Sequence, residues 1–188
     1  MYSGGLDSLG TLYYLLTDPA YKDYKIHVHH VHQNNVERRS KAEAIAVKLA
    51  LDELRSMGFN FDYSESSITT PPFGNSFMFD TDSINFFAGY VCSVNPDIEL
   101  VAMGMNSGDS NQSLDDRRKR ADAILAAFTP VKKIYPVLNL SKREIYDRLP
   151  ATLKNKFWSC RTPVYESQKI NPCGRCKTCL QLKEAGIR

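Results

Sequence analysis

The chain has 188 residues, of which 43% are hydrophobic and 24% are charged, and its formal net charge is +3. This length suffices for one full domain with a small addition. The small positive excess argues against a protein that coats nucleic acid or binds a membrane surface directly. No apolar run approaches the roughly 20 residues of a membrane span, and no secretory signal precedes the first motif, so we expect a cytoplasmic protein.

A polar motif near the start, SGGLDS at residues 3–8, combines two glycines, two serines and an aspartate. Leucines at helical spacing follow it, which predicts that the motif forms the turn opening a helix. Such a turn attracts anions, and its glycines let the backbone close around a phosphate. Asp7 is suited to hold Mg²⁺ between phosphate oxygens. The nucleotide-binding candidates are therefore Ser3, Gly4, Gly5, Leu6, Asp7 and Ser8, with Asp7 and Ser8 as catalytic candidates. The alternative is an ordinary polar turn with a helix cap.

A turn of this kind normally follows a buried strand, yet only Met1 and Tyr2 precede Ser3. A parallel sheet without a central strand would leave backbone groups unpaired on both sides. We therefore expect the natural protein to carry a few more apolar residues before Met1. The intact mass of the native protein tests this expectation.

Four histidines lie in the next predicted strand, residues 25–32. Alternation along a strand places His27 and His29 on one face and His30 and His32 on the other, so the four side chains do not converge on one metal ion. The second pair is expected to point toward whatever binds at the carboxyl end of the strand. We therefore include His30 among the candidate nucleotide-binding residues.

The rest of the chain alternates between helical and strand-like patterns. Residues 40–57 predict a helix with Ala42, Ile45, Ala46, Leu49 and Leu54 on its buried face. The pattern at residues 59–63 predicts a strand, and a long polar loop follows with TTPP at residues 69–72 and FGNS at residues 73–76. A helix is expected to begin near residue 80, and Cys92 beside its apolar face is expected to be a small buried hydrophobe.

The second half predicts two further strands. Residues 100–103 form a continuous apolar run, which predicts a buried strand. A polar turn follows at residues 104–111, where Asn106 and Asp109 are candidate ligand-binding residues. A helical pattern around residues 121–128, a short strand at residues 134–137 and a capping box at residues 141–144 follow. This alternation predicts an α/β fold with a doubly wound, mostly parallel, Rossmann-like sheet. Ligands of such sheets bind beyond the carboxyl ends of the strands.

Four of the five cysteines lie near the end of the chain, where two CxxC steps share one cysteine. This pattern favours metal binding over disulfides. Four thiolates suit a closed, structural Zn²⁺ site. An iron–sulfur cluster and a zinc-ribbon module that binds nucleic acid are the alternatives, although few basic residues surround the cysteines. The predicted ligands are Cys160, Cys173, Cys176 and Cys179.

These motifs together resemble a known family. SGGLDS resembles the PP-loop of the N-type ATP pyrophosphatases, which have an adenine nucleotide alpha hydrolase-like fold. The order of the motifs resembles the 7-cyano-7-deazaguanine synthases (QueC family). The similarity includes Ala42-Glu43, the turn with Asn106 and Asp109, the capping box at residues 141–144, and WSC at residues 158–160 followed by CGRCKTC at residues 173–179. It covers almost the whole chain and implies an ATP-binding domain at residues 1–150 and a helical zinc-bearing segment at residues 151–188.

The resemblance implies that 7-carboxy-7-deazaguanine and ammonia are converted, with ATP and Mg²⁺, to a nitrile through adenylated intermediates. It also implies a homodimer. Residues 32–39 and FGNS at residues 73–76 differ from the family pattern, and the step from Cys160 to Cys173 is longer. The alternatives are an adenylating enzyme that stops at the amide or uses another amine, a tRNA-modifying PP-loop enzyme, and a non-catalytic, zinc-bearing nucleotide-binding adaptor.

Overall fold

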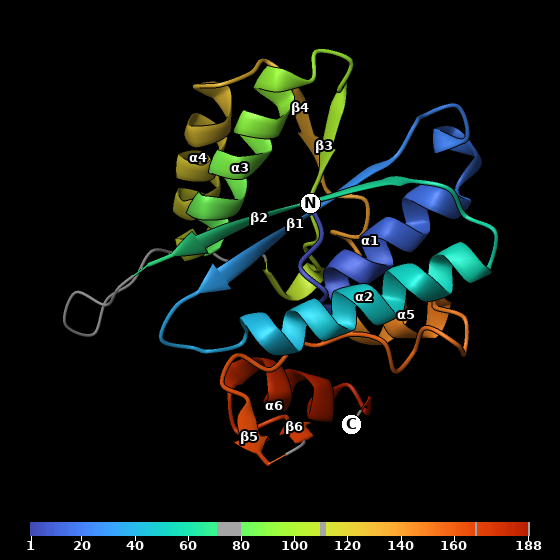
Figure 1. Ribbon diagram of the computed structural model, residues 1–188, viewed down its shortest axis with the longest axis vertical. Helices are drawn as coiled ribbons and strands as arrows, with labels where there is room; N and C mark the ends of the chain where they lie inside the picture. Colours follow the sequence, from blue (N-terminus) through green and yellow to red (C-terminus); the bar gives the residue numbers. More distant parts are fainter. Residues whose placement is uncertain (71–79, 110–111, 168, 188) are drawn as a thin grey trace.

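The computed structural model describes the whole chain except residues 71–79, 110–111, 168 and 188 (Figure 1). The TTPP and FGNS motifs therefore lie partly or wholly outside the described residues. Helices and strands alternate through most of the chain, as the hydrophobic pattern predicts. In order they are α1 (Leu6–Thr17), η1 (Pro19–Tyr21), β1 (His27–Asn34), α2 (Ser40–Ser56), β2 (Asp62–Thr69), α3 (Asp80–Val94), β3 (Leu100–Ala102), η2 (Ser107–Asp109), α4 (Gln112–Ala126), β4 (Lys132–Ile134), α5 (Lys142–Arg148), β5 (Val164–Glu166), β6 (Lys169–Asn171) and α6 (Lys177–Glu184).

The strands form two parallel pairs and one hairpin. β1 pairs with β2, β3 pairs with β4, and the antiparallel β5–β6 hairpin lies near the end of the chain. The first residues lie between the two parallel pairs (Figure 1). There the Tyr2 N–H donates to the carbonyl of His29 on β1 (2.8 Å), while the Met1 amino group donates to the carbonyl of Ala102 on β3 (2.9 Å). The predicted α/β class with parallel strands is confirmed.

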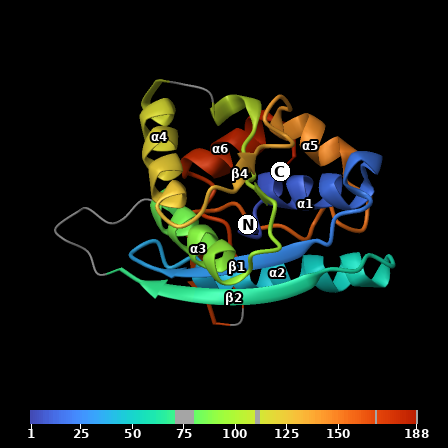
Figure 2. The same cartoon turned by 90° about the horizontal axis from the view of Figure 1, so that it is seen from above.

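Two apolar cores lie on the two sides of this arrangement. The larger core contains side chains of α1, α2 and α5, among them Leu9, Leu51 and Ile145. Tyr2, which lies beside β1, packs in the same core. The smaller core lies between the β3–β4 pair and the α3–α4 pair and includes Val101 and Leu125. Figures 1 and 2 show α3 and α4 together, apart from α1, α2 and α5. Cys92 is buried in the smaller core, which confirms its prediction as a small hydrophobe.

The helices lie where the sequence predicts them, but the predicted buried face of one helix is wrong. α1 begins at Leu6, within the SGGLDS motif, and the capping box of Ser141 and Glu144 is present, as predicted. On α2, however, Ile45 and Leu49 are nearly half exposed, so their predicted burial is wrong. The buried face passes instead through Glu43, Ala46, Val47, Ala50, Leu51 and Leu54. At 100° per residue this face is rotated away from Ile45 and Leu49, and it includes the charged Glu43 that a search for apolar residues omits.

Two predicted strands are displaced. β2 begins at Asp62, so Phe59 and Phe61 precede it, and most of its length falls where the sequence predicts a polar loop. Eight residues of β1 pair with β2. This pairing holds β2 in an extended conformation, although its serine-rich sequence has little strand propensity of its own. β4 ends at Ile134 rather than continuing to residue 137, because Pro136 has no N–H for a ladder.

The C-terminal residues 151–188 pack on the rest of the chain. Leu153, Phe157 and Leu182 belong to the larger core together with α1 and α2. The ammonium of Lys156 is also paired with the carboxylate of Glu53 at the end of α2 (2.8 Å). Among the described residues, no helix combines the length and the apolar character that crossing a lipid bilayer requires.

Candidate functional site

Residues 3–8 form the turn that opens α1. Gly4 has a φ of +79°, in the left-handed region that favours glycine, and Gly5 is the N-cap of the helix. Within the turn the Ser3 and Ser8 hydroxyl oxygens lie 3.0 Å apart, and the Ser8 hydroxyl donates to the Gly5 carbonyl (3.0 Å). The predicted placement at a helix start is therefore observed. Helix-start N–H groups and two hydroxyls give the turn the donors that an anion requires.

Close contacts fix the turn against three other segments. A Cβ on Gly104 would lie only 2.6 Å from the Ser8 backbone nitrogen, so the second residue after β3 must be glycine for this approach. A Cβ on Gly4 would similarly meet the Glu43 carbonyl oxygen and Val47 on α2 at 3.0 Å. The backbone N–H of Trp158 donates to the Gly4 carbonyl (2.8 Å). The turn is thus held by segments from three distant parts of the sequence.

Asp7 faces the first residue of α5. Its Oδ2 atom lies 2.8 Å from the ammonium of Lys142, and both side chains are largely buried, with 21% and 12% of their surfaces exposed. The other carboxylate oxygen, Oδ1, is buried and has no hydrogen-bond partner among the described residues. An uncompensated buried carboxylate oxygen is costly, and a cation bound there would compensate it. Asp7 therefore fits the predicted Mg²⁺ ligand, and Lys142 adds a cation beside it.

The polar turn after β3 folds back beside α1. Asn106 is buried, and its side-chain amide donates to Oδ2 of Asp109 (3.0 Å) while its Oδ1 accepts from the N–H of Gly108 (2.8 Å). These bonds close the turn around η2, and Gly104 carries it onto Ser8. The structure thus brings Asn106 and Asp109 to the same region as residues 3–8. Their polar atoms bond to each other.

His30 is almost completely buried under the turn. Its Nδ1 atom lies 2.9 Å from the carbonyl oxygen of Tyr2, so Nδ1 carries the proton, and Nε2 has no partner among the described residues. Burial lowers the pKa of His30 to about 4, which keeps the ring neutral at pH 7. The expected alternation is observed, since His30 and His32 stack edge to face, while His27 and His29 both contact Ser64 on β2.

A buried group of charges connects α2 to α3 and to the residue after Cys160. The guanidinium of Arg39 pairs with Glu37 (2.8 Å), Glu43 (2.6 Å) and Asp80 (2.5 Å). Arg161 pairs with Glu37 (2.7 Å) and Asp80 (3.1 Å). Burial raises the pKa of Glu43 to about 7, while Arg39 opposes that shift. These pairs tie the start of α2, beside Gly4, to the cysteine segment.

A polar hollow of about 400 Å³ opens at the carboxyl end of β1. It lies between the end of this strand and the start of α2, where parallel sheets bind ligands. Arg38 has a φ of +55°, which is unusual for a residue with a side chain, and its carbonyl accepts a hydrogen bond from the Tyr165 hydroxyl on β5. The residues that line the hollow are His32, Asn34, Asn35, Arg38, Ser40, Lys41 and Ala44.

The four predicted metal ligands lie together. The sulfur atoms of Cys160, Cys173, Cys176 and Cys179 are all within 4.8 Å of one another, close to the separation of about 3.8 Å that tetrahedral Zn–S bonds of about 2.3 Å produce. All are free thiols. The cluster could hold a metal ion such as zinc, and it leaves no ligand position for water. In the described part of the chain no other group of three or more histidine, cysteine or acidic side chains has this property.

Local hydrogen bonds orient the sulfur atoms. Backbone N–H groups donate from Cys173 to Cys160 (3.2 Å) and from Cys176 to Cys173 (3.3 Å). Burial opposes ionisation of Cys173, but bonds from the Thr162 hydroxyl and from backbone N–H groups lower its pKa to about 6. Burial raises the pKa of Cys179 to about 12. A bound metal ion would deprotonate its cysteine ligands, so metal binding at this cluster would release protons.

No protein-family model matches the chain, and no curated protein sequence matches it. The site must therefore be interpreted from its own residues. The structure brings the turn at residues 3–8, Asn106 and Asp109 to one region, and Trp158 connects that region to the cysteine cluster.

Sequence reasoning missed two contacts of the turn. Lys142 stands inside the predicted capping box, so its position suggested only a helix start, and its approach to Asp7 crosses 135 residues. Ser159 lies in the WSC motif, and its hydroxyl oxygen lies 3.5 Å from the Leu6 nitrogen. The capping box and the WSC motif were the available signals. Neither one reveals a long-range partner.

Proposed function

We propose that the chain is an ATP-dependent enzyme that converts 7-carboxy-7-deazaguanine and ammonia to 7-cyano-7-deazaguanine. ATP and Mg²⁺ would bind at the turn of residues 3–8, and Zn²⁺ would bind at the four cysteines. The observation that carries the proposal is the direct contact of these two motifs, since Gly4 accepts a hydrogen bond from Trp158, two residues before the first cysteine of the cluster. The two parallel strand pairs would then belong to one doubly wound sheet.

The chemistry requires activation of a carboxylate, which is a poor electrophile. Transfer of AMP to the carboxylate releases pyrophosphate and makes the carboxylate oxygen a good leaving group. Ammonia then displaces AMP to give an amide, and a second adenylation of the amide oxygen allows loss of AMP and two protons to give the nitrile. The enzyme must hold phosphates, metal and acid in line and keep water away from the acyl adenylate.

The residues of the turn have the properties that this task needs. The Ser3 and Ser8 hydroxyls and the backbone at Gly4 and Gly5 would bind phosphate oxygens. Asp7 would hold Mg²⁺ through its unpartnered oxygen, and Lys142 would balance phosphate charge. Mg²⁺ supplies neutralisation of charge on the transferred group when it is bound. No side-chain nucleophile is required.

The polar hollow beside β1 is our candidate for the acid substrate. Arg38 and Lys41 line it, and a carboxylate is attracted to their positive charges. Its place at the carboxyl end of β1 puts it at the same edge of the strands as the turn, because Tyr2 and β1 run side by side. The cysteine cluster would be structural, holding the segment that contacts Gly4 and Leu6.

A product assay tests the proposal. Purified protein is incubated with 7-carboxy-7-deazaguanine, ATP, Mg²⁺ and ammonium, and the products are identified by mass spectrometry. We expect the nitrile, and we expect Asp7→Ala to abolish it while the metal content is retained. An amide as the final product would show an enzyme that stops after one activation. A folded, metal-loaded protein that leaves all substrates unchanged would contradict the proposal and favour an adaptor.

A further inference from the structure

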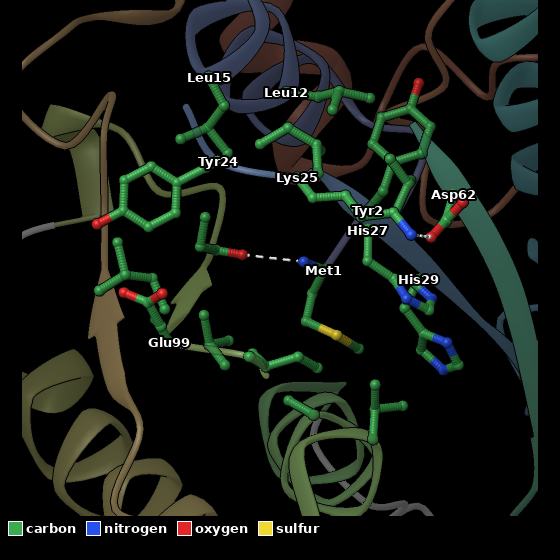
Figure 3. Close-up of a pocket in the computed structure, with 18 of the residues that line it drawn as sticks. Met1, Tyr2, Leu12, Leu15, Tyr24, Lys25, His27, His29, Asp62 and Glu99 are labelled. Atoms are coloured by element: carbon green, nitrogen blue, oxygen red, sulfur yellow. Dashed lines mark hydrogen bonds and ion pairs between the residues drawn. The ribbon is translucent and has the colours of Figure 1, made fainter. Parts of the chain in front are cut away.

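The four histidines of β1 form two pairs with different surroundings. His27 and His29 are among the residues that line a cavity of about 590 Å³ (Figure 3). Nε2 of His27 and Nδ1 of His29 each lie 2.7 Å from the hydroxyl oxygen of Ser64. The nearby carboxylate of Asp62 is paired with Lys25 instead (2.8 Å). Neither ring of this first pair is hydrogen-bonded to a carboxylate of the described residues.

His32, in the second pair, does have a carboxylate partner. Its Nε2 atom lies 2.9 Å from Oε2 of Glu65 on β2, and because an ionised carboxylate only accepts, Nε2 carries the proton. The other oxygen of Glu65, Oε1, accepts from the hydroxyl of Tyr63 (2.5 Å). The bonds from Tyr63 and His32 hold the pKa of Glu65 below its ordinary value. The Tyr63 hydroxyl thus orients an ionised carboxylate, which in turn orients the His32 ring.

The second ring nitrogen of His32, Nδ1, is available to a bound molecule. When Nε2 is protonated, the neutral ring keeps a lone pair on Nδ1. Nδ1 has no hydrogen-bond partner in the described part of the chain and is not one of its buried polar atoms. The side chain is 24% exposed and lines the polar hollow at the carboxyl end of β1. The neighbouring His30 is almost completely buried, so of this pair His32 is the one that offers a proton acceptor.

The hollow and the turn at residues 3–8 lie on the same face of the β1–β2 pair. Alternation along β1 places His30 and His32 on one face with Val28, which packs in the larger core with α1 and α2. Nδ1 of His30 bonds to the carbonyl of Tyr2, the residue before the turn (2.9 Å), and the His30 and His32 rings lie 4.5 Å apart. His32 is therefore two contacts away from the start of the candidate nucleotide site.

We infer that His32 is the catalytic base that prepares the amine nucleophile, with Glu65 as its positioning residue; this inference rests on the proposed function. Nδ1 of His32 takes a proton from an ammonium ion in the hollow and leaves ammonia. The nitrogen lone pair attacks the acyl adenylate, so that the C–N bond forms and the C–O bond to AMP breaks. The electron pair of that bond leaves with AMP, and the surplus proton on nitrogen passes to water. The imidazolium then returns its proton to solvent.

The charges around the hollow favour this direction of proton transfer. Arg38 and Lys41 oppose a further positive charge beside them, and none of the described residues that line the hollow is acidic. An ammonium ion there has no carboxylate partner, whereas the imidazolium of His32 has Glu65 at 2.9 Å. The proton is therefore more stable on His32 than on the nucleophile. The titratable and charged groups that face His32 or its carboxylate partner are His30, Arg38, Lys41, Tyr63 and Glu65.

The test measures the two half-reactions separately in the full, metal-loaded chain. Acid-dependent exchange of labelled pyrophosphate into ATP measures adenylation, and the amide and nitrile products measure transfer to the amine. We expect His32→Gln to slow transfer to ammonium by at least about 100-fold, while exchange is far less affected. Hydroxylamine is unprotonated at neutral pH, so it should restore most of the transfer in this variant. His27→Gln, on the same strand, is the matched control and should behave as the wild type does.

A pH profile at fixed total ammonium tests the positioning role of Glu65. Transfer should fall on acidification, because a protonated imidazole accepts no proton. In Glu65→Gln the maximum rate should be lower and the fall should move to lower pH, since the charge that stabilises the imidazolium is lost. A purely structural residue would lower the rate without moving the profile. Asp62→Asn, which removes another carboxylate of β2, is the control and should leave the profile in place.

Three results would overturn the inference and leave the proposed function intact. They are equal transfer in His32→Gln and His27→Gln, equal losses of exchange and transfer in His32→Gln, and equal losses with ammonium and hydroxylamine. A wild type without acid-dependent exchange would contradict the proposed function and this step with it. If His32→Gln does not fold, the profile of Glu65→Gln decides, because the Glu65 side chain is half exposed and its substitution spares the core.

Discussion

The turn at residues 3–8 and the cysteine cluster are built in different ways. The ligands of the cluster lie within 20 residues of one another, and their orienting hydrogen bonds come from neighbouring backbone groups. The turn is instead fixed by Gly104, Lys142 and Trp158, which are distant from it in sequence. Changes far from the turn should therefore disturb it, whereas the cluster should depend mainly on its own ligands and its metal.

The largest expected effect comes from removing one ligand. Cys176→Ser should lower metal content from about one ion per chain to near zero and reduce the free energy of unfolding by more than about 4 kcal/mol, because the free energy of metal binding contributes to folding. Elemental analysis and denaturant titration measure the two effects. Cys92→Ser, at a buried cysteine outside the cluster, should keep the metal. A metal-free wild-type protein, or a coloured iron protein, would contradict the zinc assignment.

The next effect concerns the charge beside Asp7. Lys142→Met should lower kcat/KM for the acid substrate about 100-fold, or about 2.7 kcal/mol of transition-state stabilisation, because the cation beside Asp7 and the phosphates is lost. Steady-state kinetics of AMP formation measure it. The control is Arg143→Met, since Arg143 is an exposed neighbour that pairs with Asp147. A loss of the same size in both variants would show that Lys142 has no special role.

A smaller effect tests the backbone contact across the turn. Gly104→Ala places a Cβ against the Ser8 backbone and should destabilise the fold by about 1–3 kcal/mol, with ATP affinity lowered and metal content unchanged. Gly108→Ala is the matched control, because its Cβ meets only the side-chain oxygen of Asn106, at 3.0 Å. Urea denaturation compares the variants. Loss of metal in Gly104→Ala would show that the turn at residues 3–8 and the cysteine cluster are not independent of each other.

The smallest effect is a pH dependence on β1. Burial lowers the pKa values of His29 and His30 to about 4, below the ordinary 6.5, so the unfolded chain binds more protons between these values. The stability contributed by the two neutral rings is therefore fully present above pH 6.5 and falls progressively as the pH drops toward 4. The charged or titratable groups near the two rings are the Met1 amine, His27, His32, Arg39 and Glu65.

His30→Asn isolates this contribution from the acid sensitivity of the cysteine cluster. An asparagine amide can still donate to the Tyr2 carbonyl but cannot titrate. The loss of unfolding free energy between pH 6.5 and pH 4.5 should be smaller in this variant than in the wild type. Identical losses would show that His30 is not the source.

The sequence predicts the local features of this fold well. Hydrophobic spacing locates α1, and the Ser141–Glu144 pair locates the start of α5, because each signal acts within a few residues. The cysteine spacing predicts a cluster that the structure confirms. Each of these features depends on residues that are neighbours in the sequence, so a local pattern is enough to predict it.

Features that depend on distant segments are less predictable. The serine-rich β2 is a strand because β1 pairs with it. The buried face of α2 is determined by tertiary packing, which buries Glu43 and leaves Ile45 exposed. The approach of Lys142 to Asp7 likewise depends on where α5 docks against α1. No local pattern contains these relationships, since tertiary contacts override propensity.

The most direct test of the proposed nucleotide chemistry is the identity of the nucleotide product. Wild-type protein and Asp7→Ala are incubated with ATP, Mg²⁺, 7-carboxy-7-deazaguanine and ammonium, and the nucleotides and phosphates are separated and quantified. Adenylation predicts AMP and pyrophosphate in equal amounts, formed only with the acid present and absent in Asp7→Ala. Formation of ADP and phosphate, or no ATP consumption by the folded, metal-loaded wild type, would contradict the account.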